Sequence, residues 1–288
     1  QNNNLQDAQN YYQKVLELDA NHSQTLNNLG VIFQGLGEIE KAKECYEKAI
    51  KIDPNYTDAL NNLGVIFQGL GENQKAKEFF EKAIEINPNY VKALNNLGIT
   101  FQRLGDNQKA KACYKKAIKI YPNYTDALNN LGVIFQGLGE NQKAKEFFEK
   151  VIKIDPNYVK ALNNLGVIFQ RLGENQKAKA CYEKAIAIDP NYVKALNNLG
   201  EIFQRLGENQ KAKEYYEKVI KIDPNYTVAH TNLTSLYIGT LDDLEKSINS
   251  SYNALKIFHN NSKFTNQSVT LFRLKHDVQQ AQYLISKN

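Results

Sequence analysis

Residues 57–90 read TDALNNLGVIFQGLGENQKAKEFFEKAIEINPNY, and this stretch decides the fold because the chain repeats it. Its Leu-Gly pair recurs every 34 residues, as Leu29-Gly30, Leu63-Gly64, Leu97-Gly98, Leu131-Gly132, Leu165-Gly166 and Leu199-Gly200. All 6 prolines occupy one position of the same period. An internal period of this length is typical of stacked repeat arrays rather than of one globular core. We therefore number positions within each repeat, with Thr57 as position 1 and Tyr90 as position 34.

The first half of each repeat has the pattern of an amphipathic helix. Its apolar residues recur at spacings of three and four, and in residues 57–90 they are Leu60, Leu63, Ile66, Phe67 and Leu70. The helix is expected to stop at Gly69-Leu70-Gly71, because glycine tolerates the left-handed conformation of a helix cap. Tight turns are therefore predicted at Gly37, Gly71, Gly105, Gly139, Gly173 and Gly207.

The second half predicts another helix. Its apolar face consists of Ala76, Phe79, Phe80, Ala83, Ile84 and Ile86. It ends at Asn87-Pro88, since proline cannot continue a helix and disfavours helical geometry in the residue before it. Glu78 and Lys82 are four residues apart in the favourable orientation for an ion pair. Each repeat is thus expected to be a helix hairpin.

Small residues indicate a close crossing of the two helices. Gly64 and Ala76 are expected to face each other there, with Phe67 and Phe80 supplying bulk on either side. This pattern resembles the tetratricopeptide repeat through Leu60, Leu63, Gly64, Phe67, Ala76, Phe80, Ala83 and Pro88, with leucine in place of the usual tryptophan. The resemblance covers six complete units. It implies an all-α, right-handed solenoid of stacked antiparallel helix pairs, whose first helices line a concave groove.

The ends of the chain depart from the repeat. Residues 1–22 match only its second helix, so we expect a truncated half repeat of a longer protein, with weak self-association through its uncovered edge. Six complete units follow over residues 23–226, and residues 227–261 form a degenerate seventh in which Thr234 replaces the glycine. Residues 262–288 are expected to be a C-terminal capping helix with the apolar stripe Leu271, Leu274, Val278, Ala281 and Ile285.

Composition narrows the class of protein. The chain has 288 residues and a net charge of +5, with Lys and Glu interspersed, so no nucleic-acid partner is expected. Its apolar runs are only a few residues long, which predicts no transmembrane helix, no signal peptide and no membrane partner. Cys45, Cys113 and Cys181 lie two repeats apart, roughly 20 Å in a stack of helices, which is too far for a disulfide. We therefore expect a reducing, cytoplasmic location.

No arrangement of residues indicates catalysis. The four histidines are His22, His230, His259 and His276, and none has a second ligand at metal spacing. No Ser-His-Asp order and no glycine-rich phosphate loop is present in the sequence. We expect no enzyme active site, metal or cofactor within these residues.

The candidate binding residues are carboxamides on the first helix. Asparagine occupies position 6 in seven repeats, as Asn28, Asn62, Asn96, Asn130, Asn164, Asn198 and Asn232, and the preceding residue is also Asn in six of them. Glutamine recurs at position 12, as Gln34, Gln68, Gln102, Gln136, Gln170 and Gln204. A carboxamide donates and accepts, so a row of them can pair with the backbone of an extended peptide. The row is similar to that of the superhelical domain of O-linked N-acetylglucosamine transferases, where inner-face asparagines hold substrate peptides. The alternative is a structural row in which each Asn bonds the neighbouring repeat.

Charge varies along the same helices. Position 2 reads Gln24, Asp58, Lys92, Asp126, Lys160 and Lys194, and position 13 reads Gly35, Gly69, Arg103, Gly137, Arg171 and Arg205. The C-terminal half thus gathers Lys160, Arg171, Lys194 and Arg205 against a single inner acid, Glu201, which favours an acidic peptide. A two-carboxylate clamp of the chaperone-binding kind is only approximated, because Val167 replaces its expected second asparagine.

We therefore interpret the chain as a protein–protein interaction scaffold that binds an extended peptide or partner protein in its groove. One alternative is a substrate-recruiting segment of a larger enzyme, of transferase or oxygenase type, whose catalytic domain lies outside these residues. The other alternative is a self-assembling repeat array.

Overall fold

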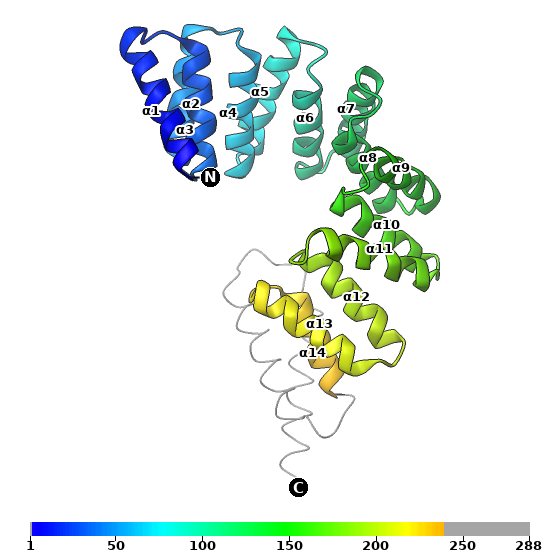
Figure 1. Ribbon diagram of the computed structural model, residues 1–288. Coiled ribbons are helices and arrows are strands. Elements are labelled where there is room, and N and C mark those ends of the chain that lie inside the picture. The colour runs from blue at the N-terminus through cyan, green and yellow to red at the C-terminus, as the bar shows by residue number, and fades with distance from the viewer. Residues whose placement is uncertain (1, 239–288) are drawn as a thin grey trace. The chain divides into compact units, whose positions relative to one another are not determined.

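The computed structural model describes residues 2–238, and this part of the chain contains 14 α-helices and no strand (Figure 1). The helices are α1 (Asn2–Leu18), α2 (Ser23–Gly35), α3 (Ile39–Ile52), α4 (Thr57–Gly69), α5 (Asn73–Ile86), α6 (Val91–Arg103), α7 (Asn107–Ile120), α8 (Thr125–Gly137), α9 (Asn141–Ile154), α10 (Val159–Arg171), α11 (Asn175–Ile188), α12 (Val193–Arg205), α13 (Asn209–Ile222) and α14 (Thr227–Ile238). We call the even-numbered helices A helices and the odd-numbered ones B helices. The end of the expected seventh repeat and the expected capping helix, with Leu271 to Ile285, lie outside the described residues.

The chain divides at Ile154 into two compact units, which are described separately. In the first unit, each A helix packs on the B helix of its own repeat and on the B helix before it, from α1 to α9. The described helices of the second unit, α10 to α14, follow the same rule. Successive A helices also touch, as α4 and α6 do. The protein is therefore an all-α solenoid of helix pairs, in which each helix contacts only its near neighbours.

The turn inside each hairpin is a Schellman cap, as the glycine pattern predicts. At the end of α4 the N–H of Glu72 donates to the carbonyl oxygen of Phe67 over 2.9 Å, and that of Gly71 donates to Gln68 over 3.3 Å. Gly71 has φ of 79°, a value that any residue with a Cβ atom adopts only with strain. The other five predicted turn glycines also have positive φ, namely Gly37, Gly105, Gly139, Gly173 and Gly207.

The close crossing is made by glycine and an aromatic ring. A Cβ atom added to Gly64 would lie 2.6 Å from Cε1 of Phe80, a fully buried side chain. The atoms nearest to that Cβ belong to the Phe80 ring, and Ala76 is also fully buried. Phe67 stacks on Phe79 with ring centroids 5.4 Å apart. Two residues predicted for the apolar faces are instead exposed because they sit at helix ends: Leu70 is 49% exposed and Ile86 37%.

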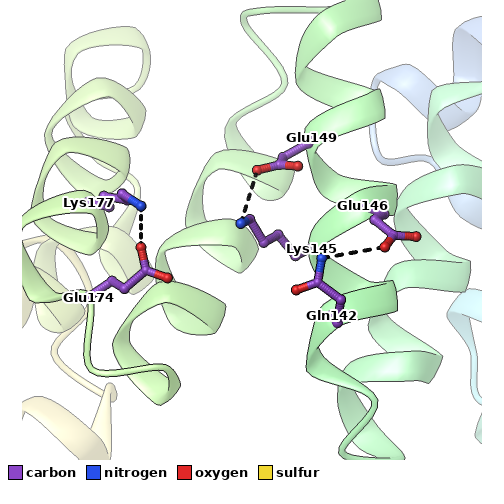
Figure 2. A network of polar contacts seen from close by, with 6 residues as sticks. All are labelled: Gln142, Lys145, Glu146, Glu149, Glu174 and Lys177. Atoms are coloured by element: carbon purple, nitrogen blue, oxygen red, sulfur yellow. Dashed lines mark hydrogen bonds and ion pairs between the residues drawn. The ribbon is translucent and has the colours of Figure 1, made fainter.

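The ion pairs on the B helices are formed by other residues than those predicted from the sequence. Glu78 and Lys82, which both lie in the described part, do not pair, and Lys77 approaches Glu81 within 3.7 Å instead. Figure 2 shows the equivalent contacts on α9, where Lys145 faces Glu149 and Gln142 donates to Glu146. Such exposed pairs contribute little to stability, so the array depends on its apolar contacts.

Candidate functional site

The accessible side of each A helix is formed by positions 2, 6, 9 and 13, and we call it the A-helix face. In α4 these positions are Asp58, Asn62, Val65 and Gly69. Their spacing of four, three and four residues aligns them along one side of a helix. Asp58 and Gly69 are exposed, while Asn62 and Val65 are partly buried. In α4 the A-helix face is therefore a polar strip with one apolar position, and in α12 that position is the acid Glu201.

The asparagines at positions 5 and 6 are joined between repeats. Asn96 donates through Nδ2 to Oδ1 of Asn61, in the preceding repeat, over 3.0 Å. The same bond is made by Asn62 to Asn27, Asn130 to Asn95, Asn198 to Asn163 and Asn232 to Asn197. The acceptor at position 5 is buried, with Asn61 only 5% exposed. Asparagine at position 6 thus has a structural role in these five repeats. Its partner is the position-5 asparagine of the preceding repeat.

Part of the hydrogen-bonding capacity at position 6 remains beyond this bond. A carboxamide has two N–H groups and an oxygen with two lone pairs, and the bond to the preceding repeat takes one N–H. Asn232 uses more, because its Nδ2 also donates to Oε1 of Glu201 over 3.3 Å. Asn28 lies 3.5 Å from the hydroxyl of Tyr12, on α1. Asn164 takes the same partly buried position on α10.

The glutamines at position 12 have two different partners. Where the B helix has tyrosine at position 24, the phenol donates to the glutamine oxygen of its own repeat, as Tyr182 does to Gln170 over 2.9 Å. The other pairs of this kind are Tyr46 with Gln34, Tyr114 with Gln102, and Tyr216 with Gln204. Where the B helix has Phe80, the glutamine Gln68 is buried and donates to Thr100 Oγ1 over 2.8 Å. Gln136 is partly buried on α8.

The residue at position 24 decides this difference and can be read from the sequence: it is Phe80 in the repeat of Gln68 and tyrosine in the repeats of Gln34, Gln102, Gln170 and Gln204. Burial raises the pKa of Tyr182, so its phenol stays protonated and can donate. The sequence predicted these glutamines only as candidate peptide-binding residues. In the structure, they also connect the two helices of a repeat or, for Gln68, two neighbouring repeats.

The four basic candidates all lie on the second unit. Lys160 and Lys194 are exposed in the first turns of α10 and α12, and Arg171 and Arg205 are the exposed last residues of these helices. Glu201 is partly buried at position 9 of α12, where its carboxylate accepts from Asn197 Nδ2 over 2.9 Å. In the first unit, Arg103 instead donates to the main-chain oxygen of Gln68.

A row of tyrosines at position 34 borders the A-helix face and was not singled out from the sequence. The hydroxyl of Tyr90 donates to Oδ1 of Asp58, at position 2 of the same repeat. Burial raises the pKa of Tyr124 to about 12, and the carboxylate of Asp126 adds to the shift. These phenols are therefore donors at neutral pH.

The described residues offer no other centre of chemistry. Cys45, Cys113 and Cys181 are free thiols, and burial raises the pKa of Cys113 to about 11, so that thiol is not activated. Within residues 2–238, no three His, Cys, Asp or Glu side chains are grouped to hold a metal ion. None of the helices in this range is long and apolar enough to cross a membrane.

Comparisons with known proteins identify the repeat. A profile described as Tetratricopeptide repeat matches residues 56–123, 93–157, 124–191 and 158–225, and two further profiles of that description match residues 23–56 and 1–22. No curated protein matches the chain.

Among solved structures, the chain is similar to one from the APC/C hetero-tetramer Cut9-Hcn1, with a TM-score of 0.76 and 16% identity over 96% of this chain and 52% of that chain. It thus spans about half the length of that protein. It is also similar to pilF of Pseudomonas aeruginosa, with a TM-score of 0.62 and 21% identity over 78% of this chain and 96% of that one. These likenesses show the fold, and the profile matches show the family. The chain belongs to the tetratricopeptide repeat family.

Proposed function

We propose that the A-helix face binds an extended peptide, or an extended segment of a partner protein, and that the chain is in this way a protein-interaction scaffold. The observation that carries the proposal is the row of asparagines at position 6. Five of the seven are fixed by a bond to the preceding repeat, as Asn96 is by Asn61, and the bond leaves part of the carboxamide for a ligand.

The repeat spacing suits such a ligand. Neighbouring A helices pack roughly 8–10 Å apart, and an extended chain in the polyproline II conformation rises about 3.1 Å per residue. One asparagine therefore meets about every third residue of the ligand. Contacts with backbone groups are tolerant of sequence, because every peptide has them. Selectivity for the ligand's sequence then comes from the side chains at positions 2, 9 and 13.

Charge at positions 2 and 13 favours acidic ligands on the second unit. Lys160, Arg171, Lys194 and Arg205 are all exposed there. The first unit has Asp58 and Asp126 beside Lys92, so its charges are mixed. Nearby charges of opposite sign steer association and select partners, and their effect falls with salt.

The test compares two ways of breaking the same asparagine bonds. Asn96→Ala with Asn130→Ala removes the proposed ligand contacts, whereas Asn61→Ala with Asn95→Ala removes the acceptors behind them and the donor that Asn61 provides to Asn62. Peptides selected on the intact chain from a displayed random library serve as ligands. The first pair should weaken their binding about tenfold more than the second, since each lost hydrogen bond contributes about 0.5–1.5 kcal/mol. If both double variants weaken peptide binding equally, the asparagine row has a purely structural role.

Self-association is a second candidate, and one observation favours it. On α1, Tyr11 is 68% exposed and Leu18 91%. Large exposed apolar side chains close together mark association surfaces. Sedimentation of the wild-type chain beside a Tyr11→Ser, Leu18→Ser variant tests it, and self-association should weaken in the variant.

A recruiting role for an attached enzyme is compatible with the same A-helix face. The free cysteines suit a reducing cytoplasm.

A further inference from the structure

We propose that the A-helix face of the second unit holds two carboxylate subsites, one repeat apart, and that its ligand is a peptide with two acidic side chains three residues apart. The inference rests on the proposed function and makes it more specific. It follows from the tyrosines at position 34 and the residues at position 2.

The first unit contains an internal example of such a subsite. Tyr90 stands at position 34, directly before α6, and its hydroxyl donates to the carboxylate of Asp58 at position 2 of α4. The phenol at position 34 is thus placed to hold a carboxylate beside the first turn of the A helix. In this repeat, the chain itself supplies that carboxylate.

In the second unit neither of these two positions carries a carboxylate. Position 34 is Tyr192 in one repeat and Tyr226 in the next, and position 2 is Lys160 and Lys194. An ammonium group and a phenol are both donors at these positions, and neither lysine forms an ion pair within the described residues. Burial raises the pKa of both tyrosines, so both keep their protons. An external carboxylate would satisfy each pair as Asp58 satisfies Tyr90.

Helix stability does not account for these lysines. A positive charge in the first turn of a helix faces the positive end of the helix dipole, which is unfavourable, whereas an acid there is favourable. The first unit follows that preference in two helices, with Asp58 in α4 and Asp126 in α8, and departs from it in α6 with Lys92. Lys160 and Lys194 reverse it in consecutive repeats, and Val228 at position 2 of α14 ends the series. These lysines therefore do not stabilise their helices, whereas they can bind an anion.

The acids that act on these phenols are Glu201 and Asp223 on Tyr226 and Asp189 on Tyr192, and each of these carboxylates already accepts a hydrogen bond from another group. Glu201 lies almost two turns further along α12 than Lys194, and its carboxylate accepts from Asn197 and Asn232. Asp189, in the turn before α12, accepts from the backbone N–H of Asn191. None of these acids forms an ion pair with Lys160 or Lys194 among the described residues, so the two subsites keep their positive charge.

The spacing of the subsites sets the spacing of the ligand's acids. The A helices α10 and α12 are direct neighbours, because Asn198 donates to Asn163 over 3.0 Å between them. Their separation of about 8–10 Å matches three residues of polyproline II, which has about three residues per turn and places every third side chain on one side. A β-extended ligand would instead present side chains two or four residues apart on one side. The ligand is therefore expected to have the pattern acidic-x-x-acidic.

The experiment uses the full chain and three fluorescent peptides of one scaffold. The first has glutamates three residues apart, the second has them two residues apart, and the third has glutamines in their place. Anisotropy titrations at low salt should give about tenfold tighter binding for the first peptide than for the third, and this advantage should shrink as salt rises. Lys160→Gln with Lys194→Gln should abolish the advantage. Lys184→Gln with Lys218→Gln, which removes the same charge from exposed positions on α11 and α13, should leave it.

A second variant tests the phenols without changing charge. Tyr192→Phe keeps the ring and removes only the hydroxyl, and it should weaken binding of the first peptide about threefold while leaving the glutamine peptide unaffected.

If glutamate and glutamine peptides bind equally, and substitution of the position-6 asparagines still weakens binding, the proposed function stands and the carboxylate subsites are wrong. If no peptide binds, both are wrong. Tighter binding of a single-stranded oligonucleotide than of the acidic peptide, or a preference for the two-residue spacing, would also overturn this proposal.

Discussion

Single residues decide how closely the helices of one repeat approach, and glycine serves two different purposes on the same A helix. At Gly132, a Cβ atom would lie 2.7 Å from Cε1 of the fully buried Phe148. At Gly137, at the end of the same helix, a Cβ atom would meet nothing within 4 Å. The first glycine is required by packing, while the second has no steric reason and weakens the helix.

Alanine at these two positions should therefore have opposite effects. Gly132→Ala must displace the Phe148 ring and should lower the free energy of unfolding by about 1–3 kcal/mol. Gly137→Ala, the matched control, should raise it by up to about 1 kcal/mol through helix propensity and a less flexible unfolded chain. Urea denaturation followed by circular dichroism measures both. A neutral Gly132→Ala variant would show that the ring moves aside without cost.

The asparagine pairs are the second feature at this scale. Asn61 is buried, and its Oδ1 accepts from Asn96 in the next repeat. Asn61→Ala and Asn96→Ala should each destabilise the chain, and a double-mutant cycle should give a coupling of about 0.5–1.5 kcal/mol. A cycle in which the two effects simply add would mean that the bond between them contributes nothing.

At the scale of the element, the hairpin turn fixes where one helix ends and the next begins. The cap of α4 uses the N–H groups of Gly71 and Glu72 to satisfy carbonyl oxygens of the last helical turn. This geometry holds only while Gly71 keeps its positive φ. The six equivalent turns set where the A helices from α2 to α12 end, and so they set the register of the A-helix face there.

Substitution of the turn glycine should separate backbone conformation from packing. Gly71→Ala should cost about 1–2 kcal/mol, because an L-residue is strained at this φ although a Cβ atom would meet no neighbour. Gly71→Asn should cost less, since asparagine adopts the left-handed conformation more readily. Equal melting temperatures for the two variants would argue that the turn relaxes to another geometry.

Much of this element-level structure could be predicted from the sequence, because periodicity and turn chemistry are local. The period located both helices, and the Gly-Leu-Gly motif located the caps. The site was harder, since the Asn-Asn doublets do not reveal which asparagine is buried between repeats and which faces outward. The partners of Gln68 and Gln102 depend on whether Phe80 or Tyr114 lies across the hairpin, which is a tertiary contact. The Tyr90–Asp58 pair is also a tertiary contact, because it joins the residue directly before α6 to the first turn of α4.

At the scale of the whole molecule, the buried tyrosines make stability depend on alkaline pH. Tyr46, Tyr114, Tyr182 and Tyr216 are fully buried, one in each of four repeats. Burial raises the pKa of each above its ordinary value of 10.0. Since the contribution comes from several repeats of both units, it belongs to the array rather than to one site.

The sign of this dependence is set by which state loses its protons first. Below pH 10 the phenols are protonated in both states, so their contribution to stability is fully present. As pH rises above 10, the unfolded chain ionises while the folded chain retains its protons, and stability falls until the folded pKa is reached. Each buried tyrosine should add a slope of about 1.4 kcal/mol per pH unit.

Tyr114→Phe should then be less stable than the wild type at neutral pH and more stable at high pH. At neutral pH the variant loses only the hydrogen bond from the phenol to Gln102, worth about 0.5–1.5 kcal/mol. At pH about 11 and above, the variant no longer has a phenol that must stay protonated to remain buried, so the two stability curves should cross. Urea denaturation at a series of pH values, with phenolate absorbance followed in parallel, measures the crossing. Curves that stay parallel up to alkaline unfolding would mean that Tyr114 ionises without unfolding the array, and that its ring is accessible to water in the folded chain.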